Sequence, residues 1–162
     1  MQIKIGLIRN LPHIRSSVEL LVIIMIKEIT IRDFFSFRGE HTIKLNSGVN
    51  LLLGVNGSGK TSFLNAITVL YEGIVGNGLS DLFRQWGSYA SIVNACGEDR
   101  PDCFSLSYVF DATELKKLVP SSPFQYDVHY KITVFPLGNG SNYSLCETLY
   151  SQDNRSKKKS FS

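Results

Sequence analysis

The sequence predicts an α/β domain in which antiparallel β-hairpins flank one strand–loop–helix unit. Alternating apolar and polar residues near both ends of the domain are typical of half-buried strands. Between them, the nearly continuous apolar run Val49–Leu53 leads into the glycine-rich loop Gly54–Gly59. From Gly59 onward the apolar residues recur at helical spacing, which predicts an amphipathic helix after the loop.

Length and composition place the chain among ordinary globular proteins. Its 162 residues allow one compact domain, and a composition of 43% hydrophobic and 19% charged residues excludes a disordered chain, a collagen and a coiled coil. Part of the net charge of +3 lies in the run Arg155–Lys159, so the nearly neutral body gives no electrostatic reason to infer nucleic-acid binding. The cysteines, three in number, fit neither a disulfide framework nor a zinc site and indicate reduced thiols in a cytoplasmic protein.

The two ends of the chain are expected to lie outside the domain. Residues 20–26 are an apolar run behind several basic residues, but no cleavage site follows, and the run is far shorter than the roughly 20 residues that span a bilayer. No membrane segment is therefore predicted. Met25 is an alternative start, so we interpret residues 1–24 as an extension of doubtful origin, residues 25–150 as the domain and residues 151–162 as a disordered basic tail.

The domain is predicted to open on a β-hairpin. Apolar and polar residues alternate loosely from Ile26 to Phe35, and after a polar turn at Arg38–Glu40 a second strand runs from Thr42 to Leu45. Val49–Leu53 is apolar with hardly a break, which is typical of a strand buried on both faces. We therefore expect a buried strand directly ahead of the glycine-rich loop.

A long helix and further antiparallel strands are expected after the loop. Helical spacing over residues 59–74 predicts about four turns. The later elements are, in order, a short helix around Leu82–Tyr89, a half-buried strand over Phe104–Phe110, one or two helical turns at Thr113–Leu118, and a strand over Tyr126–Val134 with one wet face that returns after the turn Asn139–Gly140.

The stretch Gly54–Thr61 satisfies G-x-x-x-x-G-K-[ST], the phosphate-binding P-loop or Walker A motif. Glycines let such a loop turn tightly and aim its backbone N–H groups at phosphate oxygens, and the helix N-terminus adds further donors. Lys60 is expected to reach the β- and γ-phosphates, and the Thr61 hydroxyl is expected to hold a bridging Mg²⁺. The alternative is a glycine-rich turn that binds nothing, and the predicted strand before the loop and helix after it argue against that alternative.

A family resemblance extends on both sides of this motif. It is carried by Asp33–Arg38, Thr42–Leu45, Asn50–Gly54, Asn56–Ser62 and Leu64–Ile67. With these stretches, the segment from Ile26 to Tyr71 resembles the N-terminal part of an ABC-type ATPase head of the SMC, RecF and SbcC kind, including related AAA-family ATPases of the overcoming-lysogenization-defect type. Residues 25–150 are then a partial P-loop ATPase domain.

The resemblance implies ATP and Mg²⁺ as cofactors. In these families two heads sandwich nucleotide between them, in DNA repair, chromosome organisation or defence against phage. Arg38 is a further candidate for nucleotide contact, with a solvated hairpin residue as the alternative, and Gln85 is a candidate for the glutamine that senses Mg²⁺ and the attacking water. The remaining assignments are phosphate binding by Asn56, Gly57, Ser58, Gly59 and Lys60, nucleotide contact by Thr61 and Ser62, and Mg²⁺ binding by Thr61.

Two parts that these families need for hydrolysis are not recognisable. They are an apolar strand that ends in Asp-Glu and a glycine-rich signature loop. The nearest imitation of the strand ends at Asp111, where Ala112 stands in place of Glu, and its alternation better suits a half-solvated antiparallel strand. Asp111 is kept as a candidate metal ligand. The catalytic residues stay unknown.

Two functional classes follow from these observations. In the first, the chain is the ATP-binding N-terminal part of an SMC/RecF-like AAA-family ATPase that hydrolyses ATP when complete, with the missing C-terminal lobe, a second ATPase head and DNA as partners of the full assembly. In the second, it is a truncated non-catalytic module that binds nucleotide or a partner. A complete small kinase or GTPase-like protein is a third possibility, but its second metal-binding Asp is not evident.

Overall fold

The computed structural model describes residues 25–74, 78–87, 89–94, 101–137 and 142–151. The predicted extension over residues 1–24 and residues 152–162 of the predicted tail lie outside these ranges. Among the described residues, no helix is both long enough and apolar enough to cross a membrane.

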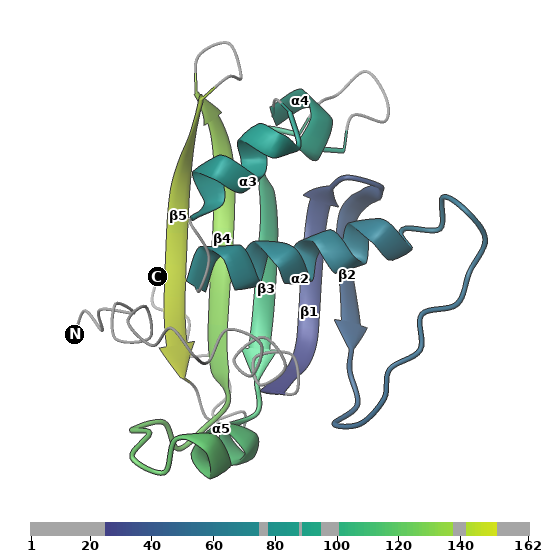
Figure 1. The fold of residues 1–162 in the computed structure, drawn as a ribbon. Helices are drawn as coiled ribbons and strands as arrows, with labels where there is room; N and C mark the ends of the chain where they lie inside the picture. The colour runs from purple at the N-terminus through teal and green to yellow at the C-terminus, as the bar shows by residue number, and fades with distance from the viewer. Residues whose placement is uncertain (1–24, 75–77, 88, 95–100, 138–141, 152–162) are drawn as a thin grey trace, which may run out of the picture.

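A single antiparallel sheet forms the centre of the described structure (Figure 1). Its strand order is β2-β1-β3-β4-β5, and each neighbouring pair is antiparallel. The predicted α/β class and the antiparallel pairing of both predicted hairpins are therefore confirmed. The first turn lies at Phe35–Ser36 and not at the predicted Arg38–Glu40, which belongs to β2, and the predicted turn Asn139–Gly140 lies outside the described residues. The strands are β1 (Ile26–Phe34), β2 (Phe37–Lys44), β3 (Phe104–Phe110), β4 (Val128–Leu137) and β5 (Asn142–Ser151).

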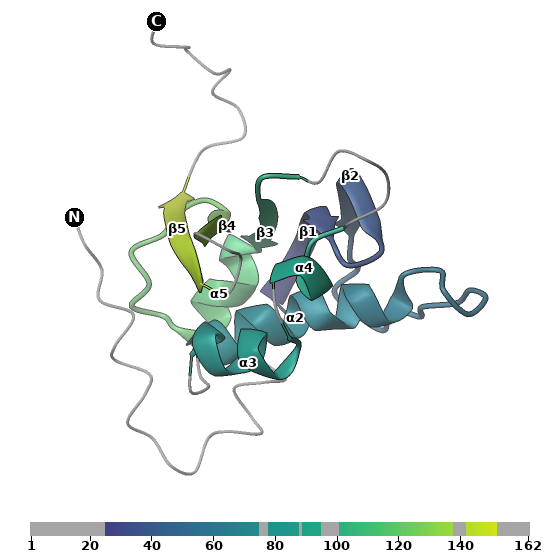
Figure 2. The same ribbon diagram turned by 90° about the horizontal axis from the view of Figure 1, so that it is seen from above.

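Helices cover one face of this sheet, as the view from above shows (Figure 2). Helix α2 (Lys60–Ile74) crosses the strands and confirms the helix predicted after the loop. The helix expected around residues 82–89 is instead two, α3 (Leu79–Gln85) and α4 (Tyr89–Ile92), because Gly87, with φ of +99°, ends the first of them. The predicted turns at residues 113–118 are confirmed as α5 (Ala112–Leu118), at one end of the sheet.

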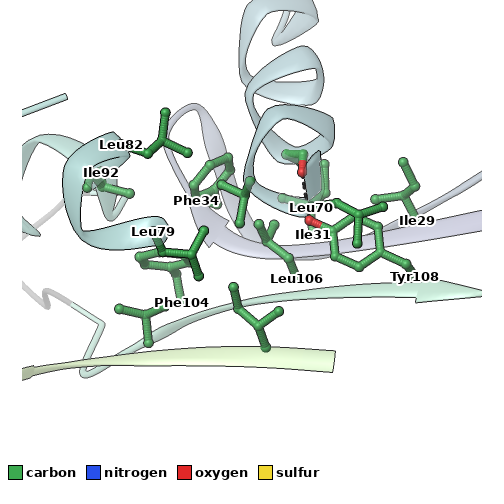
Figure 3. Packing of buried hydrophobic residues seen from close by; sticks show 14 of the residues in the cluster. Ile29, Ile31, Phe34, Leu70, Leu79, Leu82, Ile92, Phe104, Leu106 and Tyr108 are labelled. Atoms are coloured by element: carbon green, nitrogen blue, oxygen red, sulfur yellow. Dashed lines mark hydrogen bonds between the residues drawn. The ribbon is translucent and has the colours of Figure 1, made fainter. Parts of the chain in front are cut away.

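The hydrophobic core lies between the sheet and the helices (Figure 3). Strand alternation sends Ile31, Leu106 and Ile132 to the same face, where Leu70 of α2 packs against them. The buried Tyr108 hydroxyl donates a hydrogen bond of 2.6 Å to the carbonyl oxygen of Ala66 in α2. This bond fixes α2, and with it the loop that precedes α2, against the sheet.

The opposite face of the sheet is open to solvent. On β4, Val128 and Tyr130 are buried while Lys131 is exposed and His129 and Thr133 are half-buried. The wet face that the sequence predicts for this strand is confirmed.

The buried strand predicted at Val49–Leu53 is wrong. These residues lie in no strand or helix, and Val49, Leu51 and Leu53 are 93%, 76% and 80% exposed. They belong to a wide excursion of the chain between β2 and α2 (Figure 1). A strand buried on both faces needs a place inside a sheet with both faces covered, and Val49–Leu53 pairs with none of the five described strands.

Candidate nucleotide-binding loop

The glycine-rich loop Gly54–Gly59 has the tight backbone path that its sequence predicts. Gly57 and Gly59 have φ angles of +84° and +90°, a region that residues with a Cβ rarely adopt. The Ser58 N–H closes a turn on the carbonyl oxygen of Val55 at 3.2 Å. At Gly54 an added Cβ would lie 2.5 Å from Ser58 Oγ and 3.1 Å from Ser58 Cβ, so a larger residue there would have to displace the Ser58 side chain.

The Lys60 ammonium lies across this loop. It donates hydrogen bonds to the carbonyl oxygens of Gly54 and Val55, at 2.7 and 2.8 Å, and to Ser58 Oγ at 3.3 Å. Lys60 is also the first residue of α2, and the N-terminal end of a helix dipole is positive. Loop and lysine together form an arrangement that favours an anion with several oxygens.

The two hydroxyl residues after Lys60 have different surroundings. Thr61 is exposed in the first turn of α2, whereas Ser62 is buried. The Ser62 hydroxyl shares a hydrogen bond of 2.7 Å with the Ser36 hydroxyl and accepts a longer one, 3.4 Å, from the Ser36 N–H. The structure therefore brings Asn56–Thr61 together at the loop, while the Ser62 side chain points toward the β1–β2 turn. The nucleotide contact assigned to Ser62 stays a prediction.

The turn between β1 and β2 packs directly on the loop. A Cβ added to Gly59 would lie 3.2 Å from Ser36 Oγ and 3.4 Å from the Phe37 ring. Arg38, the next residue, is exposed, and its carbonyl oxygen accepts a hydrogen bond of 2.8 Å from His41 Nε2. Arg38 thus lies one residue from a ring that contacts the loop, and its predicted role stays a prediction.

Ser36 is a residue that the sequence did not single out. The stretch Asp33–Arg38 contributed to the family resemblance, but only Arg38 was chosen from it. The contact between Ser36 and Ser62 joins residues 26 apart, and no spacing rule for strands or helices predicts such a pair.

Asp111 lies far from the loop and is the N-cap residue of α5. Its carboxylate accepts hydrogen bonds from the N–H groups of Thr113 and Glu114, at 2.7 and 3.2 Å, and so caps α5. Burial favours the neutral acid, but these N–H groups and nearby Lys27 hold the pKa of Asp111 below its ordinary value.

The position of Asp111 along the sheet excludes a role at the loop. Its N–H donates to the carbonyl oxygen of Met25, just before β1 begins, whereas Ser36 follows the far end of β1. A strand of nine residues spans about 30 Å at about 3.3 Å per residue. The hypothesis that Asp111 holds a metal at the loop is therefore wrong.

Gln85 is the candidate for the glutamine that senses Mg²⁺ and the attacking water. Gln85 is exposed at the end of α3, beside Trp86, whose ring packs against Phe34 and Phe35. Its sensing role stays a prediction. Within the ranges that the structure covers, no group of three or more His, Cys, Asp or Glu residues could hold a metal ion.

Comparison with known proteins supports the interpretation of this region. Residues 28–107, from β1 into β3, match a family model described as an AAA domain, and the match contains the whole loop and α2. The resemblance to the N-terminal part of an SMC/RecF/SbcC-like ATPase is confirmed. The DNA double-strand break repair Rad50 ATPase of Archaeoglobus fulgidus is 41% identical over 51 residues, which are 32% of this chain. The matched segment is only 6% of that relative's length.

Proposed function

We propose that this SMC/RecF/SbcC-like chain has the P-loop NTPase fold and binds ATP and Mg²⁺ through Asn56–Lys60, with Thr61 as the metal ligand. We further propose that it is part of a cytoplasmic ATPase that hydrolyses ATP only when its remaining parts are present. One observation carries the proposal, namely the Lys60 ammonium bonded across a loop with positive φ at Gly57 and Gly59.

The chemistry of each group suits a triphosphate. The loop N–H groups and the N-terminus of α2 supply donors for phosphate oxygens, and Lys60 supplies the charge for the β- and γ-phosphates. Bound Mg²⁺ would neutralise the β- and γ-oxygens. The Thr61 hydroxyl is exposed and beside Lys60, and hydroxyl oxygen is a suitable ligand for that ion. Arg38, the second residue of β2, is the residue that we propose as a further nucleotide contact.

The exposed apolar segment 49–55 supports the proposal that further lobes are needed. Val49, Leu51 and Leu53 are mostly in solvent, and Leu64 on the outer side of α2 is 53% exposed. Burying one such side chain is worth roughly 1.5–3 kcal/mol, so a covering partner gains substantially here. We propose that the C-terminal lobe of the ATPase covers this segment and that a second head and DNA join the full assembly.

A binding experiment tests the proposal. We expect the wild-type chain to bind ATP in the presence of Mg²⁺ in equilibrium dialysis, and Lys60→Ala to bind about tenfold more weakly or worse, because a charge-assisted contact to phosphate is lost. Lys131→Ala removes an exposed lysine on the open face of the sheet and is the matched control, so its affinity should equal that of the wild type.

Phosphate release in the same samples separates the two functional classes. Binding without release is expected for a chain that awaits its other lobes. Release that depends on Lys60 would show that a catalytic carboxylate is present in this chain and would contradict that part of the proposal. If the wild type does not bind ATP, the loop is not a working nucleotide site.

A further inference from the structure

The β1–β2 turn is held in an unfavourable backbone conformation. Asp33 and Phe35 have φ angles of +52° and +48°, in the left-handed region that residues with a Cβ seldom adopt. Such a conformation persists only where surrounding contacts hold it, and it is frequent at functional sites. Contacts from two sides hold this turn, and they come from segments far apart in the sequence.

One set of contacts comes from residues 92–94, which are the last residue of α4 and the two residues after it. The Phe35 N–H donates to the carbonyl oxygen of Ile92 at 2.6 Å, and the Asn94 side-chain amide donates to the carbonyl oxygen of Phe35 at 2.7 Å. The Asn94 N–H donates to the carbonyl oxygen of Asp33 at 2.9 Å. Both left-handed residues are therefore bonded to this segment.

The other set comes from the nucleotide-binding loop and the first turn of α2. The Ser36 and Ser62 hydroxyls are 2.7 Å apart, and Ser36 also lies against Gly59. Ser62 follows Lys60 and Thr61 immediately, so it belongs to the turn of helix that bound phosphates would contact.

We propose that Ser36 is a positioning residue that couples nucleotide occupancy of the loop to the segment 92–94. This inference rests on the proposed ATP binding. Either serine can be the donor of the bond between them. A phosphate oxygen only accepts, so when Ser62 donates its single proton to phosphate, its bond to Ser36 can persist only with Ser36 as the donor. A phosphate is the stronger acceptor because it is charged. When nucleotide binds, the Ser62 proton goes to the phosphate, Ser36 is left as the only possible donor to Ser62, and the contact that holds the turn on the side of the loop is rearranged.

Rearrangement of this contact alters the packing of Phe34 and Phe35, and the protein contains its own reporter for that change. Trp86 is the one tryptophan of the chain. Its ring centroid lies 5.4 Å from that of Phe35 and 6.3 Å from that of Phe34. Trp86 contacts Phe34 and Phe35, and none of the contacts described above joins it to the glycine-rich loop. Its emission therefore reports on the turn.

The test measures Trp86 fluorescence and bound ATP in the same samples. Excitation at the red edge of tryptophan absorption avoids adenine, and equilibrium dialysis counts bound nucleotide. We expect ATP with Mg²⁺ to change the emission of the wild type. In Ser36→Ala, the change per bound nucleotide should fall about threefold or more, because a contact along the coupling route is missing.

Three further variants separate coupling from general loss of structure. Ser36→Thr keeps the hydroxyl and should keep the response. Ser36→Cys keeps the size of the side chain with a weak donor, should give an intermediate response, and serves if Ser36→Ala does not fold. Ser144→Ala removes an exposed hydroxyl on β5 and should respond as the wild type does.

Each outcome decides the coupling. ATP binding without a change in Trp86 emission overturns the coupling and leaves the proposed function intact, as does an unchanged response per bound nucleotide in Ser36→Ala and Ser36→Cys. A wild-type chain that binds no ATP in dialysis overturns the proposed function and the coupling together.

Discussion

Two segments of this chain that carry large aliphatic side chains, β1 and residues 49–55, have opposite surroundings. In β1, Ile29 and Ile31 are fully buried, with β2 and β3 paired to the two edges of the strand. In the second segment, Leu51 and Leu53 remain mostly in solvent. The difference shows that aliphatic side chains give a segment a tendency to be buried, whereas its neighbours in the fold decide whether it is buried. The five described strands form one continuous sheet, and the glycine-rich loop extends from a segment that pairs with none of them.

The largest effect is expected from one leucine of each region. Leu106→Ala removes a fully buried side chain and should lower the free energy of unfolding by about 2–5 kcal/mol. Leu53→Ala, at a site that is 80% exposed, should change it by about 0.5 kcal/mol or less. Urea denaturation followed by circular dichroism measures both. Equal losses would mean that Leu53 is buried in solution and would break the comparison.

A smaller loss of stability is expected from the bond that anchors α2, and so the loop, to the sheet. Tyr108→Phe removes the buried hydroxyl that donates to Ala66 and should lower the free energy of unfolding by about 1 kcal/mol. Tyr143→Phe is the matched control, because its hydroxyl bonds Ser80 in an exposed position and should contribute less. If the control costs as much as Tyr108→Phe, the buried bond does not anchor the helix.

An effect of similar size, which depends on pH, concerns the end of the sheet that is far from the loop. Asp111→Ala removes the cap of α5 and should lower the free energy of unfolding by about 1 kcal/mol at neutral pH. The folded-state pKa of Asp111 is lowered from its ordinary 3.8, so the carboxylate stabilises the fold above that value. The stabilisation should disappear as the pH falls through the lowered pKa.

Denaturation of the wild type and Asp111→Ala, near neutral pH and again in acid, checks this dependence. ATP binding by Asp111→Ala should match that of the wild type, because Asp111 lies at the opposite end of β1 from the loop. A gap between the two proteins that persists in strong acid would contradict the capping role, and lost ATP binding would restore the discarded metal role.

Most of the sheet could be predicted from the sequence because local alternation determines which face of a strand is buried. Residues Val128–Val134 of β4 are a clear case. Helical spacing after Gly59 predicts α2 in the same local way. Val49–Leu53 could not be placed, since its composition is that of a buried strand but its burial depends on neighbours that no local pattern reveals.

The loop itself could be predicted because its residues are consecutive, whereas its support could not. Ser36 reaches Ser62 only through the folding of β1 against α2, and Asp111 ends a strand whose register sends it to the wrong end of the sheet. Tertiary placement, rather than residue type, decided both cases.

The central claim is that the sheet is well ordered without nucleotide, whereas the proposed nucleotide site at residues 54–60 is not. Amide hydrogen exchange with and without ATP and Mg²⁺ tests this claim most directly. Without nucleotide, we expect slow exchange in β1 and β3 and fast exchange over residues 49–60, because exposed backbone outside regular structure is poorly protected. With ATP and Mg²⁺, residues 54–60 should gain protection while β1 and β3 stay unchanged. Protection of residues 49–53 without nucleotide, or no change at residues 54–60 with saturating ATP, would contradict the claim.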